Sequence, residues 1–361
     1  MSTISGPSAA ALHSLSPSEI RFLQSLPKAE LHAHLNGSIP LQTLVELAQD
    51  LPPSTDTDNE IAGTIERLRS GLTLDEISDF FPLFPAIYAL TSTPSALSRA
   101  TRDVLDAFLK PRNDPLPGSI YTPTPECAYI ELRTTPRATA HLSRYTYLTT
   151  VLDEIEKFRP DQAALIVSID RRMSDADAAE CVHVAIALWD AGRRVVGLDL
   201  CGDPRRGDVS TFEKHFRRGK DAGLSVTVHI AETRENTAVE SRILLGWHPD
   251  RLGHATFLSR EYIALFFTDE RGVYKPCIEI CLSSNLLCGT VRSLEAHHIQ
   301  YYLANNHPIS ICTDDTLPFR TTLLGEYALL LAKPPLGLGL NHEQVRRIAQ
   351  MGMDARFGKG K

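Results

Sequence analysis

The sequence has no long apolar run and no excess of positive charge. No stretch reaches about 18 uncharged apolar residues, which excludes a transmembrane helix. Residues 1–15 are rich in Ser and Ala but lack the basic start and apolar centre of a secretory signal. The net charge of −7 and the pI of about 6.0 argue against broad binding to nucleic acid or anionic membranes. We therefore expect a soluble, cytoplasmic protein without a nucleic-acid or membrane partner.

Paired cysteine motifs are also missing. The chain has seven cysteines, an odd number spread over a long sequence, and most of them stand in apolar runs. This pattern favours reduced, buried thiols over a disulfide framework. Cys277, Cys281 and Cys288 lie near one another in the sequence, but their spacing matches no zinc pattern built from C-x-x-C pairs. A metal site made of these cysteines is therefore the weaker interpretation.

Short β-prone runs alternate with helix-sized segments along most of the chain. Eight runs are predicted as strands: Ala29–Leu35, Cys127–Thr134, Ala164–Asp170, Arg194–Leu200, Leu224–Ala231, Arg251–His254, Cys277–Leu282 and Pro308–Thr313. Short strands with helix-sized connections indicate βα units, and eight of them favour a closed α/β barrel, the TIM or (β/α)8 fold. We expect one domain over residues 1–361, with residues 1–15 flexible.

Three local signals refine this outline. Ser16-Pro17-Ser18-Glu19 has the pattern of a capping box and predicts a helix that runs to about Ser25. Thr73-Leu74-Asp75-Glu76 is a second candidate capping box, ahead of an apolar stretch rich in phenylalanine. Residues 111–125 contain five prolines among Asn, Asp, Gly and Ser, which predicts an exposed surface loop.

Unusual polar residues follow the predicted strands. They stand at, or just past, the carboxyl end of a strand: His34, Arg133, Asp170, Gly202, His229, His254, Ser284 and Asp314. TIM barrels build their active sites on that face, because the loops after the strands meet there. The sequence therefore predicts one functional site at the C-terminal rim of the barrel.

Four of the rim residues have the chemistry of a metal site. His32 and His34 are two apart on a strand, so both imidazoles point to the same face. His229 ends the fifth strand and Asp314 the eighth. Three neutral imidazoles and one carboxylate suit a single Zn²⁺ and leave a position for water, whereas Asp314 and Asp315 taken alone are typical of a loop or helix cap.

Binuclear amidohydrolases offer a rival interpretation of this ligand set. They bridge two metals with a modified lysine on the fourth strand, and residues 195–200 contain no lysine. One zinc ion per chain is therefore expected.

Glu232 and His254 complete a hydrolytic centre. A zinc ion lowers the pKa of its water towards about 7 and so supplies hydroxide at neutral pH. His254 is placed to take that proton or to hold the nucleophile in line, and Glu232, three residues after His229, is the candidate acid. Glycine at 202 lets a backbone N–H approach a flat heterocycle. The structural alternatives are a hydrogen-bonded rim histidine and a helix-capping glutamate.

The motifs in order resemble those of the adenosine deaminase superfamily. They are Glu30-Leu31-His32-Ala33-His34-Leu35, His229-Ile230-Ala231-Glu232, Gly253-His254, Ser283-Ser284-Asn285 and Thr313-Asp314-Asp315. The resemblance spans about residues 27–327. It implies a purine substrate, with zinc bound by the residues matching His32, His34, His229 and Asp314. It also implies that Glu232 donates a proton to purine N1, that His254 is catalytic, and that Gly202 and Asp315 contact the purine. The unrelated cytidine-deaminase fold carries P-C-x-x-C, which is absent here.

Within the superfamily the chain looks most like the adenosine-deaminase-like branch, which acts on N6-methyl-AMP. The supporting segments are residues 35–38, 131–137, 168–172 and 278–285. The resemblance implies nucleotide contacts at His34, Asn36, Thr101, Arg102, Asp103, Val104 and Asp170. Asn36 stands where ordinary adenosine deaminases usually have aspartate. Tyr88 stands where the branch often has histidine, although that position also belongs to the substrate site.

The expected reaction is hydrolysis of N6-methyl-AMP to IMP and methylamine by a monomeric enzyme. Adenosine deaminase or adenine deaminase activity, with release of ammonia, is the alternative within the same class. A catalytically silent, nucleoside-binding member is the alternative of another class, and the presence of all four ligand residues and Glu232 speaks against it.

Overall fold

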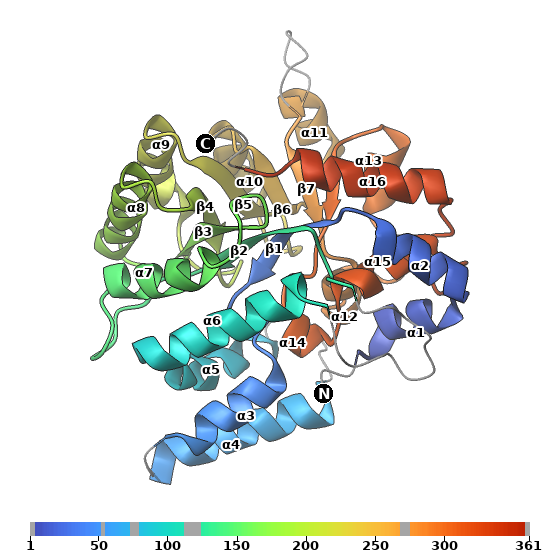
Figure 1. Ribbon diagram of the computed structural model, residues 1–361. Coiled ribbons are helices and arrows are strands. Elements are labelled where there is room, and N and C mark those ends of the chain that lie inside the picture. The colour runs from blue at the N-terminus through green and yellow to red at the C-terminus, as the bar shows by residue number, and fades with distance from the viewer. Residues whose placement is uncertain (1–3, 52–54, 73–78, 112–123, 268–274, 358–361) are drawn as a thin grey trace.

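The computed structural model describes residues 4–51, 55–72, 79–111, 124–267 and 275–357, and its centre is a barrel of eight parallel strands (Figure 1). The strands are β1 (Ala29–His34), β2 (Tyr129–Thr134), β3 (Ala163–Asp170), β4 (Val195–Cys201), β5 (Ser225–Ile230), β6 (Arg251–His254), β7 (Cys277–Ile280) and β8 (Ile309–Ile311). They pair in sequence order from β1 to β8. The TIM-barrel prediction is confirmed, and all eight predicted strands are present, β6 with the predicted bounds and the others with one or both ends shifted.

The barrel closes where β8 meets β1. Ala33 and Asp314 form a parallel bridge. The backbone N–H of Asp314 donates to the carbonyl of His32 at 2.8 Å, and the N–H of His34 donates to the carbonyl of Asp314 at 3.0 Å. The backbone hydrogen bonds that close the barrel therefore also set the positions of three predicted metal ligands relative to one another.

Helices surround the barrel because each parallel strand needs a crossover connection to the next. Those after β2 are α7 (Arg144–Ile155), α8 (Asp175–Asp190), η3 (Val209–Phe212), α9 (Glu213–Asp221), α10 (Ala238–Gly246), α11 (Arg260–Phe267), α12 (Leu282–Leu287), α13 (Ile299–Ala304), α14 (Thr316–Phe319), α15 (Leu323–Leu331) and α16 (His342–Asp354). Within the described part of the chain, no helix has both the length and the apolarity to cross a bilayer.

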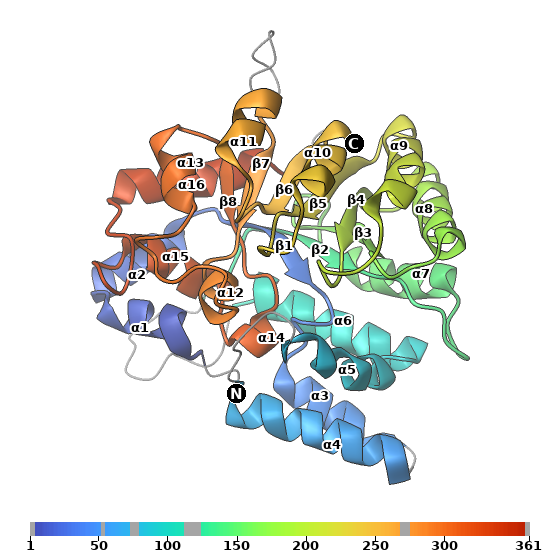
Figure 2. The ribbon, with the colours of Figure 1, turned by 180° about the vertical axis from the view of Figure 1, so that it is seen from behind.

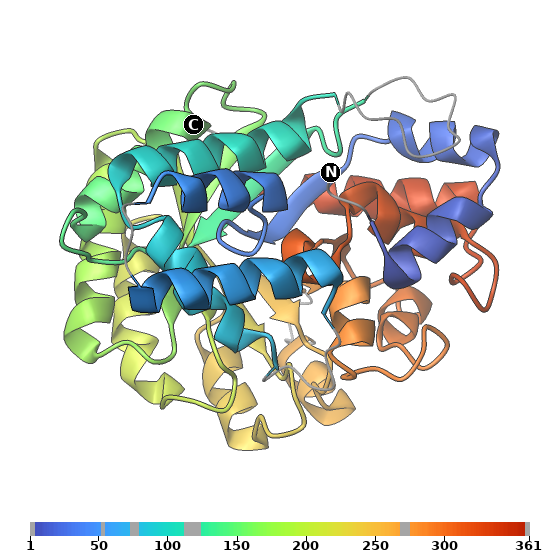
Figure 3. The same ribbon diagram turned by 90° about the horizontal axis from the view of Figure 1, so that it is seen from below.

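The connection between β1 and β2 is the longest and covers one end of the barrel. It contains α3 (Leu41–Gln49), α4 (Thr55–Ser70), η2 (Phe81–Leu83), α5 (Phe84–Leu90) and α6 (Pro94–Leu109). Figures 1 and 2 show these helices gathered below the barrel, and Figure 3 shows α3 and α4 across that end. The candidate capping box at residues 73–76 and most of the proline-rich segment 111–125 lie outside the described residues.

The N-terminal segment is more ordered than the sequence suggested. Residues Gly6–Ser14 form helix α1, which packs against α15, and Ala11 and Leu12 are buried. The expectation that residues 1–15 are flexible is therefore wrong for this stretch, because its small apolar side chains pack against α15 and α12, which are distant in the sequence. The capping box at Ser16 is confirmed, since Ser16 and Glu19 bond reciprocally at the start of α2 (Pro17–Ser25).

Phe357, just after α16, fills the end of the barrel away from the rim. Its ring centroid lies 3.5 Å from the guanidinium carbon of Arg251, and its N–H donates to Glu131 Oε1 at 2.6 Å. A Cβ at Gly197 would lie 2.9 Å from this ring, so the fourth strand needs glycine there. The C-terminal segment is thus part of the barrel core.

Phe357→Ala is expected to lower the free energy of unfolding by about 3 kcal/mol or more, because it removes a buried ring and leaves a cavity. Leu336→Ala is the matched control, since Leu336 is 41% exposed. Urea denaturation of both variants measures the difference. A loss no larger for Phe357→Ala than for the control would contradict a core role for this residue.

Candidate active site

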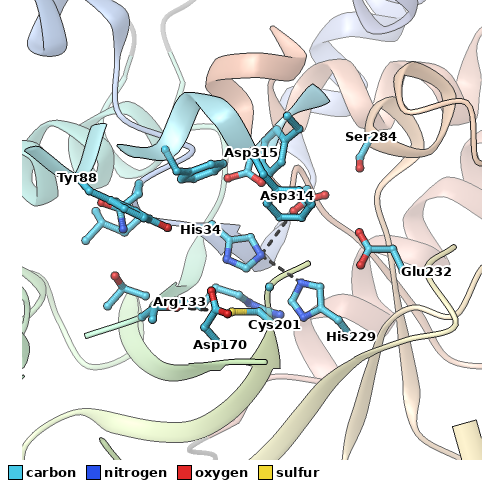
Figure 4. A pocket seen from close by; sticks show the side chains of 18 of the residues that line it. His34, Tyr88, Arg133, Asp170, Cys201, His229, Glu232, Ser284, Asp314 and Asp315 are labelled. Atoms are coloured by element: carbon cyan, nitrogen blue, oxygen red, sulfur yellow. Dashed lines mark hydrogen bonds and ion pairs between the residues drawn. The ribbon is translucent and has the colours of Figure 1, made fainter. Parts of the chain in front are cut away.

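A cavity of about 310 Å³ opens at the C-terminal rim of the barrel. Residues from β1, β2, β5 and the segments after β3, β4 and β8 line it together with residues of α5 and α12. Figure 4 shows His34, Asp314 and His229 near its centre, with Tyr88 on one side and Glu232 on the other. Seven of the eight predicted rim residues line this one cavity, and His254 does not.

Four predicted ligands converge at the floor of this cavity. His229 Nε2 lies 3.0 Å from His32 Nε2 and 3.2 Å from His34 Nε2. Asp314 Oδ1 lies 3.6 Å from the Nε2 atoms of both His32 and His34. His32 is fully buried, His229 and Asp314 are nearly so, and the side chain of His34 is 19% exposed. The ligand atoms of the three histidines lie within 4.8 Å of one another, and Asp314 approaches two of them.

The tautomers of two histidines show that this cluster suits a cation. His32 Nδ1 lies 2.6 Å from Glu279 Oε2 and donates to that carboxylate. His229 Nδ1 lies 2.9 Å from the carbonyl of Leu200, which can only accept, and 3.0 Å from Asp199 Oδ1. Metal binding requires both rings to be neutral, which leaves their Nε2 atoms unprotonated, with lone pairs that face each other at 3.0 Å across the position of the ion. Burial also lowers the pKa of His34 to about 3, so it too offers a neutral nitrogen. The donor set fits one Zn²⁺.

Arg133 links the two carboxylates that orient these histidines. Its guanidinium lies 2.9 Å from Glu279 Oε2 and 3.4 Å from Asp199 Oδ1, with no exposed surface. Burial acts to raise the pKa of Glu279, but Arg133 and Arg251 outweigh it and hold that pKa below its usual range. An ionised Glu279 keeps the proton on His32 Nδ1, as such carboxylates do for metal-binding histidines.

The backbone takes a left-handed conformation just after three of the strands or at their ends. Positive φ occurs at Ala231 (47°), at His254 (60°) with Ala255 (51°), and at Asp314 (62°). These conformations are disfavoured for residues with a Cβ, and they cluster at functional sites. Here they turn the side chains of Glu232, His254 and Asp314 towards the cluster, so that His254 Nε2 lies 3.4 Å from Glu232 Oε1 and 4.0 Å from Asp314 Oδ2. The predicted acid and the predicted catalytic histidine are neighbours.

Two glycines allow close approach at the cavity wall. A Cβ at Gly37 would lie 1.4 Å from Asp315 Oδ1, so only glycine fits beside this carboxyl. Gly202 has a φ of 101°, and a Cβ there would lie 2.7 Å from Asp170 Oδ1. Asp315, Gly202 and Asp170 all line the cavity, as predicted.

Asn36 and Tyr88 also line the cavity. Asn36 is buried, and its Oδ1 has no hydrogen-bond partner among the described residues. The Tyr88 ring centroid lies 3.8 Å from the guanidinium carbon of Arg137. Burial raises the pKa of the Tyr88 phenol, so this side chain is a neutral hydroxyl.

Four predicted substrate contacts lie away from the cavity. Thr101, Arg102, Asp103 and Val104 belong to α6, and none of them lines the cavity. Thr101 is buried and donates to the carbonyl of Leu97, Val104 packs in the core, and Asp103 accepts from Thr43. Their role as nucleotide contacts, which the resemblance implies, stays a prediction that the lining of this cavity does not support.

The structure adds residues that the sequence-based prediction missed. Thr134 at the end of β2 and Thr135 directly after it line the cavity, and the rim rule applied to that strand would have found them. An apolar wall is formed by Phe80, Phe81, Phe84 and Phe319. The orienting carboxylates Asp199 and Glu279 were also missed, although a charged residue inside a buried strand is a usable signal.

The cysteines are free and buried. Cys201 and Cys288 reach the cavity wall, but among the described residues every group that could hold a metal consists of histidine and aspartate. The cysteine cluster is therefore not supported as a metal site.

Known proteins match most of this chain in sequence. The sequence profile of the family described as adenosine deaminase matches residues 27–360. The human N6-methyl-AMP deaminase (Homo sapiens) is 34% identical over 323 residues, which cover 87% of this chain and 84% of that protein. The N6-mAMP deaminase of Arabidopsis thaliana is 30% identical over 368 residues, covering 94% and 95%.

Solved structures agree with the sequence matches. A crystal structure of Arabidopsis N6-mAMP deaminase has a TM-score of 0.78 and 31% identity and covers 94% of this chain and 96% of that one. A complex of an Arabidopsis relative with IMP gives the same TM-score, covering 94% of each chain. The match over residues 27–360, together with the motif residues gathered on one rim, shows that the chain belongs to the adenosine deaminase family.

Proposed function

We propose that this protein hydrolyses N6-methyl-AMP to IMP and methylamine, using one zinc ion per chain. The observation that carries the proposal is the cluster of three imidazole nitrogens, with Asp314 near two of them, beside Glu232 and His254. The names of the human and Arabidopsis relatives support the substrate, and a relative's complex with IMP supports a nucleotide product.

The roles follow from the positions of the side chains. His32, His34, His229 and Asp314 would hold the zinc ion, which when bound activates a water molecule for attack at C6. Glu232 donates a proton to purine N1, because attack at C6 places negative charge on that nitrogen. His254 accepts a proton from the attacking water, and its Nε2 lies within reach of the cluster. Asp315 and the backbone of Gly202 orient the purine.

The opposite side of the cavity suits the ribose phosphate. Tyr88 lies across His34 from Glu232 (Figure 4). Arg172, whose side chain is 52% exposed, pairs with Asp170 at 2.6 Å and lines the same cavity. We assign Arg172 to the 5′-phosphate, which would replace Asp170 as the partner of its guanidinium. The free cysteines support a reducing compartment, the cytoplasm, and a monomer is expected because the described site is complete within one chain.

The direct test is product analysis. Zinc-loaded protein incubated with N6-methyl-AMP should release IMP and methylamine in equal amounts, measured by liquid chromatography and mass spectrometry. Release of neither product by zinc-loaded, folded protein would reject this function.

Asn36→Asp tests the preference for a nucleotide. A carboxylate there would face the phosphate, and two charges about 4 Å apart interact with about 4 kcal/mol at an effective dielectric near 20. Solvent and salt reduce this to a net of roughly 1–3 kcal/mol, or about 10–100-fold. We expect kcat/KM to fall by that factor on N6-methyl-AMP and much less on N6-methyladenosine. Equal losses on both compounds would show that Asn36 is structural.

A further inference from the structure

His298 contacts the backbone of His254 from outside the cavity. His298 Nε2 lies 2.9 Å from the carbonyl oxygen of His254. We propose that His298 is a positioning residue that locks the left-handed turn at His254 and so aims the His254 imidazole at the reaction centre. The proposal rests on the proposed function for its kinetic readout but not for its structural one.

The turn at His254 needs an external restraint. His254 and Ala255 have φ values of 60° and 51° in succession, and such conformations persist only where the surroundings enforce them. The ring nitrogens of His254 make no hydrogen bond among the described residues, and the ring's contacts are the longer ones to Glu232, at 3.4 Å, and to the ring of His32. The backbone that carries the ring therefore contributes to its direction.

The bond to the carbonyl of His254 determines which nitrogen of His298 carries the proton. A carbonyl oxygen can only accept, so the proton sits on His298 Nε2. Burial lowers the pKa of His298 to about 4, so the ring is neutral and Nδ1 is unprotonated. Nδ1 is buried without a partner in the described residues, which leaves the bond to His254 as the ring's polar contact. A buried carbonyl deprived of this donor would be left unsatisfied, and rotation of the 254–255 peptide would relieve that cost.

His298 is itself held in place by its neighbour. Its ring stacks on His297 with the centroids 4.3 Å apart and an angle of 20° between the planes. His297 Nδ1 accepts from the N–H of Ile299 at 3.0 Å, so its Nε2 donates to Asn285 Oδ1, also at 3.0 Å. Asn285 in turn donates to Thr256 Oγ1 at 3.3 Å.

The segment after β6 is therefore clamped at two points. His298, at the start of α13, bonds to residue 254, and Asn285, on α12, bonds to residue 256. The motif Ser283-Ser284-Asn285 thus has a role in holding the loop that carries His254, besides the contribution of Ser284 to the cavity wall.

Two substitutions separate the hydrogen bond from ring packing. His298→Phe keeps a stacked ring and removes the donor, whereas His298→Gln keeps a donor at the Nε2 position and loses the ring. We expect His298→Phe to lower kcat on N6-methyl-AMP by about 10–100-fold, since displacement of a catalytic group by about 1 Å costs up to about 10²-fold. Its KM and zinc content should stay within about twofold of the parent, and His298→Gln should keep most of the activity. His183→Phe, at an exposed position, is the control.

Two further measurements exclude a merely structural role. A nucleotide with a tetrahedral, hydroxyl-bearing carbon in place of C6 should bind to His298→Phe more weakly by the same factor as the loss in kcat, with IMP affinity unchanged. A crystal structure of His298→Phe should show the 254–255 peptide rotated, and this readout needs no activity. An unmoved peptide, an unchanged kcat, equal losses in both variants or a loss of zinc would each overturn the proposal. Failure of the proposed function would instead show in the parent protein, as an absence of turnover.

Discussion

Glu232→Gln is expected to lower kcat on N6-methyl-AMP by about 10²–10⁴-fold, the usual worth of general acid catalysis. Glu232 lines the cavity, is nearly buried, and lies 3.4 Å from His254 Nε2. Glutamine preserves the shape and hydrogen-bonding reach of the side chain but has no acidic proton to transfer to N1. The fold, the zinc content and the affinity for IMP should therefore stay close to those of the parent.

Glu235→Gln is the matched control for this experiment, because Glu235 is exposed three residues further along the same loop. Its kcat should be unchanged. A Glu232→Gln variant that keeps near-full kcat would mean that another group protonates the purine, and the assignment of Glu232 as acid would be withdrawn.

Loss of the metal is expected to abolish turnover. Protein purified in metal-free buffers with limiting zinc should contain about one zinc per chain by elemental analysis. Removal by a chelator should reduce activity to background, and one equivalent of zinc should restore it. The cluster requires the ion because the neutral Nε2 atoms of His32 and His229 face each other at 3.0 Å.

A His229→Ala variant tests the need for zinc by mutation. It removes one nitrogen ligand and leaves Asp199 and Arg133 as a buried ion pair, so zinc should be lost while most of the barrel core is intact. Two essential ions per chain, or full activity without zinc, would contradict the mononuclear site.

Residues with a regular pattern were predictable from the sequence. The strands were found because short, β-branched runs recur at helix-sized spacing, and the site was found because His34, His229 and Asp314 each follow such a run. The carboxyl ends of parallel strands lie at the same end of the barrel. Residues that follow different strands in the sequence are therefore close together in space.

Other parts depended on contacts that no local pattern encodes. Thr101–Val104 was assigned by resemblance over a stretch without a distinctive motif, and the structure places it on the packed helix α6. The phenylalanine wall joins Phe80 and Phe84 to Phe319, more than 200 positions away, and only tertiary packing brings them together. The left-handed turn at His254 and its bond to His298 were equally invisible, since neither residue type signals positive φ or a carbonyl partner.

The most direct test of the account is a comparison of kcat/KM on AMP, N6-methyl-AMP, adenosine and N6-methyladenosine with the same zinc-loaded protein. The account predicts the highest value on N6-methyl-AMP, with N6-methyladenosine lower by roughly 10-fold or more, because a neutral Asn36 does not repel the phosphate and Arg172 would exchange Asp170 for the phosphate as its partner. A higher value on adenosine or N6-methyladenosine than on either nucleotide would contradict it.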